Sequence, residues 1–205
     1  MARSGGDKTR RRILAAAEKI FSTRGFDATS VDRIARTAGV NKALIYYHFK
    51  NKNDLILKLF ESIIEEVAVH VESQTDVGPS DNDMALKRKI QDEVEFLAER
   101  SRILSVMLAE ALRSNQRDDF LFRCAEMVIQ REHGREPVRK VSGVPKRPAR
   151  RHMVHEFFTG FVPLVAFVAL RDKWCQYFNY SPKQVTGDFI EAFAESHLAS
   201  PMKQG

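Results

Sequence analysis

Two short helical patterns separated by a glycine, within residues 29–52, constrain the fold of this chain more than any other stretch. The first pattern has its apolar residues at the spacing that places them on one face of a helix: Val31, Ile34, Ala35 and Ala38. Gly39 then breaks the pattern, as the C-terminal end of a helix requires. The stretch therefore predicts a helix over about residues 31–37, a tight turn and a second helix over about residues 42–48.

Polar residues at the two predicted helix starts are suited to capping. Thr29 and Asp32 have the spacing of a capping box, and Ser30 can also cap the first helix. Asn41 is a good N-cap for the second helix. On that second helix, Leu44 and Ile45 are predicted to face inward together with one of two adjacent tyrosines.

The outer face of the second helix is predicted to carry Lys42, Ala43, one tyrosine and His48. Short and cationic side chains let a helix enter a major groove, and tyrosine hydroxyls reach phosphate oxygens. The alternative is a solvated helical hairpin with two core aromatics. Helix-turn-helix units commonly bind DNA, so the pattern favours DNA binding.

The segment VDRIARTAGVNKALIYYHFKNKNDLI, residues 31–56, resembles the N-terminal DNA-binding domain of the TetR family of bacterial transcriptional repressors. The match is carried by Ile34-Ala35, Ala38-Gly39-Val40, Tyr46-Tyr47-His48-Phe49, Lys50, Lys52 and Leu55. The chain departs from the family at Asn41-Lys42-Ala43, where such repressors often have Ser and then Gly. These outward residues differ, so no operator sequence is carried over. Both tyrosine positions approach DNA in that family, and the predicted DNA-binding residues are Ser30, Asn41, Lys42, Ala43, Tyr46, Tyr47, His48 and Lys52.

Charge is divided unevenly along the chain. Residues 1–60 carry 13 Lys and Arg against 5 Asp and Glu, a net charge of +8, whereas the remainder carries 20 against 22, a net charge of −2. A basic first third on a near-neutral body is typical of a nucleic-acid-binding domain joined to a second module. Lys8 and Arg10–Arg12 form a basic cluster that can neutralise phosphates beside the groove.

The chain is predicted to be cytoplasmic, with no membrane partner. Residues 2–12 are charged and contain no apolar signal segment. The most apolar run, residues 157–170, is 14 residues long, short of the roughly 18 that a spanning helix needs. Cys124 and Cys175 are interpreted as free buried thiols, with a redox-sensing pair as the alternative.

Apolar periodicity elsewhere predicts an all-α fold of about nine helices. An N-terminal three-helix DNA-binding domain, residues 1–52, is followed by a larger helical ligand-binding and dimerisation domain, residues 53–205. Residues 1–7 are predicted to be a mobile arm, and a long helix from Lys50 to about Ser73 joins the two domains. Residues 74–83 are interpreted as a linker. Residues 135–151 are interpreted as an exposed basic loop, with a second nucleic-acid contact as the alternative.

The helix predicted over residues 152–173 is apolar nearly all round, and Pro163 is expected to kink it. Such a helix must be covered on every side, and one chain of this length lacks the material to do so. With the last helix, about residues 182–198, it can form a four-helix bundle with a twofold copy. The resemblance implies the same homodimer, and the predicted interface residues are Phe158, Leu164, Val165, Val168, Phe189, Phe193 and His197.

The resemblance also implies a pocket in the body for a small apolar or amphipathic ligand. The candidate lining residues are large, adaptable side chains, with ordinary core packing as the alternative for each: Phe96, Met107, Phe122, Met127, Phe157, Phe161 and Trp174. No cofactor is expected. His152, His155 and Glu156 lie within one turn, but their spacing is not that of a zinc-protease motif, and surface residues are the favoured interpretation over a metal site.

The sequence therefore predicts a ligand-responsive repressor, not an enzyme, whose homodimer binds palindromic operator DNA. Two alternatives stay open. One is a constitutive DNA-binding or architectural protein whose body only dimerises, and the other is a metal-dependent sensor built on the His152 cluster.

Overall fold

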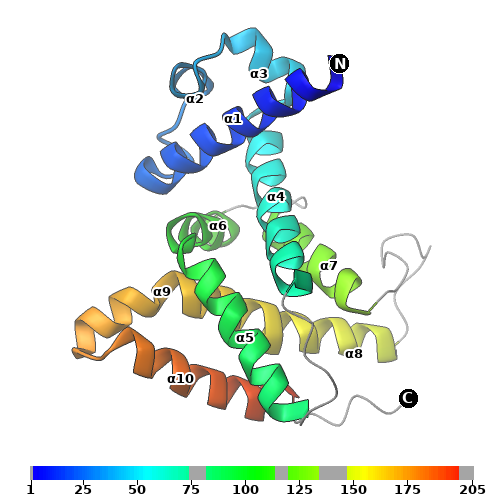
Figure 1. The fold of residues 1–205 in the computed structure, drawn as a ribbon, viewed down its shortest axis with the longest axis vertical. Helices are drawn as coiled ribbons and strands as arrows, with labels where there is room; N and C mark the ends of the chain where they lie inside the picture. Colours follow the sequence, from blue (N-terminus) through cyan, green and yellow to red (C-terminus); the bar gives the residue numbers. More distant parts are fainter. Residues whose placement is uncertain (1, 74–81, 114–119, 134–146, 199–205) are drawn as a thin grey trace.

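The computed structural model of the chain describes residues 2–73, 82–113, 120–133 and 147–198, and these residues form helices with no strand among them (Figure 1). The α-helices are α1 (Ala2–Arg24), α2 (Val31–Ala38), α3 (Lys42–His48), α4 (Lys52–Ser73), α5 (Asn82–Ala98), α6 (Ser101–Arg113), α7 (Phe120–His133), α8 (Arg147–His155), α9 (Val162–Phe178) and α10 (Pro182–Phe193). The π-helical segments η2 (Glu156–Phe161) and η3 (Ala194–Leu198) continue α8 into α9 and extend α10. The described residues thus confirm the all-α prediction, with nine helices when these continuous segments are joined.

The first three helices form a separate unit at one end of the molecule (Figure 1). Its turn follows from Gly39, whose φ of 63° lies in the left-handed region that side chains disfavour. The amides of Gly39 and Val40 then donate to carbonyls of the last turn of α2, so the helix end is satisfied. Residues 1–7 were predicted to be a mobile arm, and that is wrong from Ala2 onward, where α1 already begins.

Caps fix where the short helices start. The amide of Arg33 donates to Ser30 Oγ at 3.3 Å, and the amide of Leu44 donates to Asn41 Oδ1 at 2.8 Å. Thr29 is not the cap that the capping-box spacing predicted. Its side chain is buried and donates to the Gly25 carbonyl at 2.8 Å, so it closes the loop before α2 instead.

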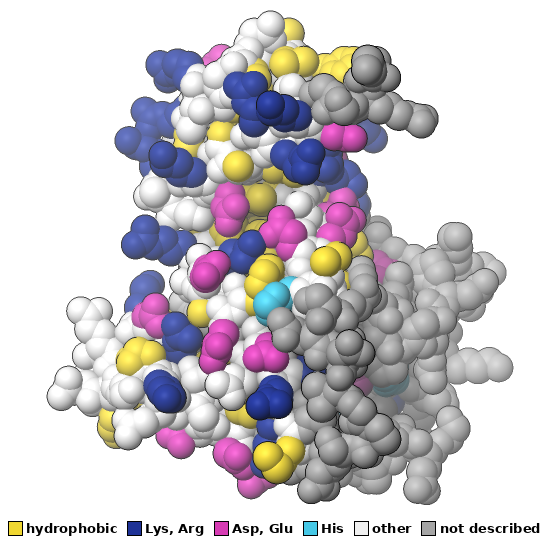
Figure 2. All heavy atoms as spheres, in the orientation of Figure 1, with side chains coloured by type: hydrophobic (Ala, Val, Ile, Leu, Met, Phe, Trp, Pro, Cys, Tyr) yellow, Lys and Arg dark blue, Asp and Glu magenta, His cyan; other side chains and the backbone are white. Residues whose placement is uncertain are grey.

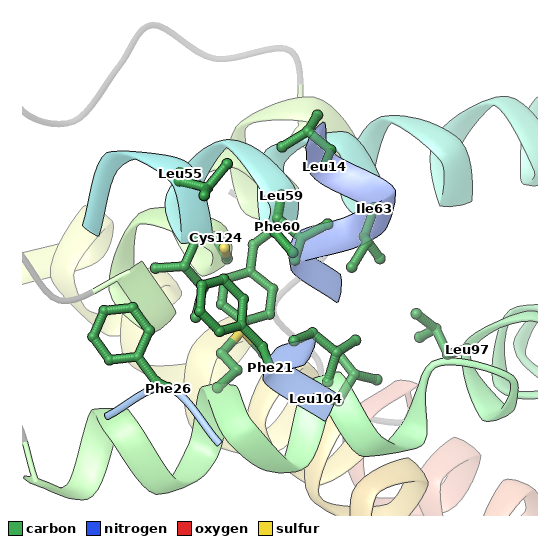
Figure 3. Packing of buried hydrophobic residues seen from close by; sticks show 14 of the residues in the cluster. Leu14, Phe21, Phe26, Leu55, Leu59, Phe60, Ile63, Leu97, Leu104 and Cys124 are labelled. Atoms are coloured by element: carbon green, nitrogen blue, oxygen red, sulfur yellow. The ribbon is translucent and has the colours of Figure 1, made fainter. Parts of the chain in front are cut away.

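One hydrophobic core joins the N-terminal unit to the body. Phe21 of α1 and Phe60 of α4 are both fully buried, and they lie beside Leu104 of α6 and Cys124 of α7 (Figure 3). Helix α4 runs from the N-terminal unit into the body, as predicted (Figure 1). The body helices and α1 are therefore in contact through closely packed side chains.

The continuous helix α8–η2–α9 begins at Arg147, five residues before the predicted start at His152. Pro163 lies in the first turn of α9, directly after the π-helical turn η2. Proline has no N–H and its ring excludes the carbonyl four residues earlier, and the wider turn accommodates both effects within one helix. Of the predicted linker, residues 74–83, the last two belong to α5 and the rest lie outside the described residues. Of the predicted loop, residues 135–151, the last five belong to α8 and the rest lie outside the described residues.

Residues Arg150–Phe178 form a helix that is long and apolar enough to cross a membrane, by length and composition alone. The sequence prediction considered only the uninterrupted apolar run of residues 157–170. It overlooked an 18-residue window within this helix, whose mean hydropathy is 1.8. Only 22% of the window is buried within the chain. This helix packs on α5, α6, α7 and α10, and Phe158, Leu170 and Trp174 remain exposed on it.

Candidate nucleic-acid interface

Helix α3 presents its polar side outward and is anchored by one apolar side. Ile45 and the following Phe49 are fully buried, whereas Asn41, Lys42 and Ala43 are exposed. Both tyrosines are exposed, Tyr46 by 48% and Tyr47 by 81%. The prediction that one tyrosine faces inward is therefore wrong, because Phe49 fills that place in the core.

The remaining predicted contact residues flank the same surface. Ser30 is exposed at the start of α2, and His48 is half-buried, with its ring edge-on to Tyr47 at 5.0 Å between centroids. Lys and Arg side chains gather over this end of the molecule, and Asp and Glu become more frequent over the body (Figure 2). A cationic surface of this kind attracts a phosphate backbone.

Lys42 is held by an acidic residue that the sequence pattern had indicated only as part of a cap. Its Nζ lies 2.8 Å from Oδ2 of Asp32 on α2, and both side chains are exposed. Hydrogen bonding to Lys42 lowers the pKa of Asp32 below its usual value, and the same bond raises the pKa of Lys42. The pair joins the first turns of α2 and α3.

Lys52 is largely occupied by contacts within the chain. Its Nζ donates to the carbonyls of Phe26 at 3.0 Å and Thr29 at 3.2 Å, and it lies 4.2 Å from the centre of the Phe26 ring. These contacts tie the loop between α1 and α2 to the start of α4. A lysine ammonium has three donors, so one donor is left for a phosphate.

Arg12, expected within the phosphate-binding basic cluster, is exposed but also bonds within the chain. Its Nη2 donates to the carbonyls of Ala38 at 2.7 Å and Gly39 at 3.3 Å. A cation bonded to the last carbonyls of a helix is favourable there because those carbonyls form the negative end of the helix dipole. Arg12 thus fixes the turn between α2 and α3 from the neighbouring helix α1.

An ion pair connects the N-terminal unit to the body, and another joins α4 to the residue before α6 within the body. Arg113 at the end of α6 pairs with Asp27, in the loop after α1, and with Glu110 at 2.6 Å. Near the other end of α6, Arg100 pairs with Glu66 of α4 at 2.6 Å. Burial raises the pKa of Glu18 on α1, while the charge of nearby Arg100 opposes that shift.

The predicted ligand-lining residues do not converge on one cavity. Three of them form an aromatic cluster between α7 and η2, in which the ring of Phe157 lies 5.4 Å from that of Phe122 and 6.2 Å from that of Phe161. Met127 of α7 is half-buried and packs against the core, and Met107 of α6 is buried inside it.

The other two candidates lie elsewhere. Phe96 stacks on His70, with 4.5 Å between ring centroids, beside a small acidic hollow of about 310 Å³. Trp174 lines an open groove of about 770 Å³ between α9 and α10.

The predicted dimer residues divide between two faces. Val165, Val168 and Phe193 are buried within the chain, at 4%, 2% and 8% exposure, so they belong to its own core and are removed from the predicted interface. Phe158 is 63% exposed, and Leu164 is half-buried. Phe189 stacks on Phe167 with 3.9 Å between ring centroids along the α9–α10 groove. The side chain of His197 lies outside the described residues.

The His152 cluster forms local contacts. His152 Nδ1 lies 3.6 Å from Glu156 Oε1, and His155 Nδ1 lies 2.9 Å from the Thr159 hydroxyl. Among the residues that the structure describes, no three His, Cys, Asp or Glu side chains are grouped to hold a metal ion. Cys124 and Cys175 are both buried and form no disulfide with each other, as interpreted.

Comparisons with known proteins agree with this geometry. Residues 13–59 match the family described as bacterial regulatory proteins, tetR family. The transcriptional regulator EthR of Mycolicibacterium smegmatis is 30% identical over 90 residues, which cover 44% of this chain and 42% of that protein. The transcriptional repressor NicS of Pseudomonas putida is 28% identical over 109 residues, covering 52% of this chain and 50% of that protein. The matched segments thus span half or less of these relatives.

The likeness of fold extends over nearly the whole chain. A TetR family transcription regulator from Marinobacter aquaeolei superposes with a TM-score of 0.63 at 18% identity, and the match covers 95% of this chain and 97% of that one. At this identity the likeness concerns the fold alone.

Proposed function

We propose, from the match of residues 13–59 to the tetR family of bacterial regulatory proteins, that the chain is a transcriptional repressor acting on operator DNA. The observation that carries the proposal is the outer face of α3. This face combines an exposed lysine, an exposed alanine and two exposed tyrosines on a helix anchored by Ile45 and Phe49. Such a helix can enter a major groove, with Lys42 and Ala43 toward the bases and the tyrosine hydroxyls on phosphates.

The proposed DNA-binding set comprises Ser30, Asn41, Lys42, Ala43, Tyr46, Tyr47, His48 and Lys52, with Lys52 in a minor role because two of its donors are used internally. The proposed division of the chain falls at residue 52, where α4 begins. No catalytic role is proposed.

We propose that the protein is a homodimer joined through its last two long helices, α8–η2–α9 and α10. The support is the helix that spans residues 150–178, whose apolar window is only 22% buried within one chain. Exposed Phe158, Leu170 and Trp174 leave an apolar surface that water would disfavour, and a twofold copy would cover it. A twofold dimer places two α3 helices on successive turns of one DNA face, about 34–36 Å apart, and so requires a palindromic site. Burial against the second protomer would also explain how so apolar a helix occurs in a cytoplasmic protein, with no membrane needed.

We further propose that a small apolar or amphipathic ligand releases the protein from DNA. The aromatic cluster of Phe122, Phe157 and Phe161 supports a site between α7 and η2. Release requires the ligand to bind the DNA-incompetent arrangement more tightly than the competent one. The alternative, a constitutive DNA-binding protein, would have equal DNA affinity with and without every ligand.

The test is the affinity for DNA from immediately upstream of the protein's own gene, against scrambled DNA of equal length, at two salt concentrations. Specific binding should exceed non-specific binding by roughly 10³-fold or more. Equal affinity for both duplexes, collapsing with salt, would leave only phosphate binding and would favour the architectural alternative. The same assay then serves as a screen for the ligand that releases the complex.

A further inference from the structure

The exposed ion pair between Asp32 and Lys42 places a negative charge within the surface proposed to face DNA. The two charged atoms are 2.8 Å apart, and the side chains are 59% and 49% exposed. A carboxylate at this position repels DNA, which is a polyanion. A functional role for Asp32 would explain why an acidic residue occurs there.

Three other acidic residues of the first 60 have evident structural roles. Asp54 accepts a hydrogen bond from the Lys50 amide at 2.8 Å at the start of α4. Asp27 forms an ion pair with Arg113 of the body, and Glu18 interacts electrostatically with Arg100. Asp32 differs because its ion-pair partner is itself a proposed DNA contact.

We propose, on the basis of the DNA-binding role proposed for α3, that Asp32 is a specificity-determining residue. It holds Lys42 in a neutral pair and thereby suppresses binding to phosphates alone. A free lysine at this position would neutralise a phosphate on any sequence, because non-specific binding is driven by counterion release. To neutralise a phosphate, Lys42 must first break its ion pair with the Asp32 carboxylate. The unpaired Asp32 carboxylate then repels the same phosphate.

A base contact does not require the pair to open. The Lys42 ammonium has three donors and Asp32 accepts one of them, which leaves two for acceptors such as guanine O6 and N7. The pair therefore penalises phosphate-only complexes more than complexes in which Lys42 meets its base. The hydrogen bond lowers the pKa of Asp32 and raises the pKa of Lys42, so both groups stay charged near neutral pH.

The experiment compares Asp32→Asn, Lys42→Gln and the double variant with the unchanged chain on scrambled duplex DNA at several salt concentrations. Asp32→Asn should bind scrambled DNA about 5-fold more tightly near 0.15 M salt, and the slope of log affinity against log salt should steepen by about 0.9, the value for one added phosphate contact. With Lys42→Gln present, the Asp32→Asn change should leave that slope unaltered. Preference for the upstream DNA over scrambled DNA should fall by about the same factor in Asp32→Asn.

Glu65→Gln is the matched control, because it changes the net charge equally at an exposed position on α4 away from α3. Melting curves establish that each variant is folded. An unchanged slope in Asp32→Asn, or equal steepening without Lys42, would overturn the proposal. A loss of operator affinity with an unchanged slope on scrambled DNA would also overturn it and would make the pair a purely structural link between α2 and α3.

A different result bears on the proposed function. If the unchanged chain does not prefer the upstream DNA, the repressor proposal loses its support, while the slope on scrambled DNA still decides the role of Asp32.

Discussion

Replacing Gly39 by alanine tests how the turn between α2 and α3 is held. Gly39 has a φ of 63°, a conformation that costs an L-residue roughly 1–2 kcal/mol. The new Cβ would lie 3.0 Å from Nη2 of Arg12, so the guanidinium must shift by a few tenths of an ångström, which perturbs its 2.7 Å hydrogen bond to the Ala38 carbonyl. Weakening this hydrogen bond adds about 0.5–1.5 kcal/mol. We expect Gly39→Ala to lower the free energy of unfolding by about 1.5–3.5 kcal/mol.

Two other glycines separate the backbone contribution from the contact. Gly25 has a φ of 77°, but a Cβ added there would have no atom within 4 Å, so Gly25→Ala should lose only the backbone part, roughly 1–2 kcal/mol. Gly6 lies in α1 with open space around it, and Gly6→Ala should be neutral or should stabilise by up to about 1 kcal/mol.

Chemical unfolding at one fixed protein concentration measures all three variants. Combining each with Arg12→Met should remove the difference between Gly39→Ala and Gly25→Ala, since only the former disturbs Arg12. A Gly39→Ala variant as stable as the unchanged chain would refute this account of the turn, and so would a difference that persists without Arg12.

Three further outcomes are expected. Tyr47→Phe should weaken operator binding by about 2- to 10-fold through one lost phosphate hydrogen bond with unchanged melting, and an unchanged affinity in a titration would remove Tyr47 from the contact set. Phe158→Asp should turn the dimer into monomers in sedimentation equilibrium, because a charge would have to be buried, and a persisting dimer would place the interface elsewhere. Burial raises the pKa of Glu18, so folding binds a proton between the unfolded and folded pKa values and the free energy of unfolding falls as pH rises through that window. Glu18→Gln should flatten that fall in unfolding titrations across pH, and an identical profile would contradict the assignment.

Local signals in the sequence predicted the elements of the fold well. Gly39 and Asn41 carry the information for the turn and for the start of α3 within a few residues, and both act in the structure as predicted. A predicted helix cap was wrong where contacts with a neighbouring segment determine the role of a residue. Thr29 has the spacing of a cap, yet its hydroxyl bonds back to Gly25 once the loop is formed.

The cations show why the site was harder to predict than the fold. Arg12 and Lys52 were both assigned to phosphates because of their charge and position in the chain. Each also bonds to backbone carbonyls about 26 residues away in sequence, and local sequence patterns do not predict a contact of that kind. The partners of long flexible side chains depend on the tertiary structure. Charge along the sequence therefore predicts the surface potential better than the role of each lysine or arginine.

Three of the predicted dimer residues proved to be core residues for a related reason. Helix α9 is apolar on nearly every side, so periodicity does not separate the face that meets α5 and α6 from the face left open. Val165 and Val168 proved to be on the inner face, whereas Leu170 and Trp174 are exposed on the outer one.

The shared core of Phe21, Phe60, Leu104 and Cys124 has a consequence for protein engineering. Regulators built from independent modules can be recombined by cutting the linker between them, and each half keeps its own interior. Here a cut at the start of α4 would strip Phe21 of the aromatic and aliphatic neighbours that shield it from water. A chimaera that transplants α1–α3 should therefore carry the first half of α4 with it, and it should match the recipient's α6 and α7 side chains in volume as well as in polarity.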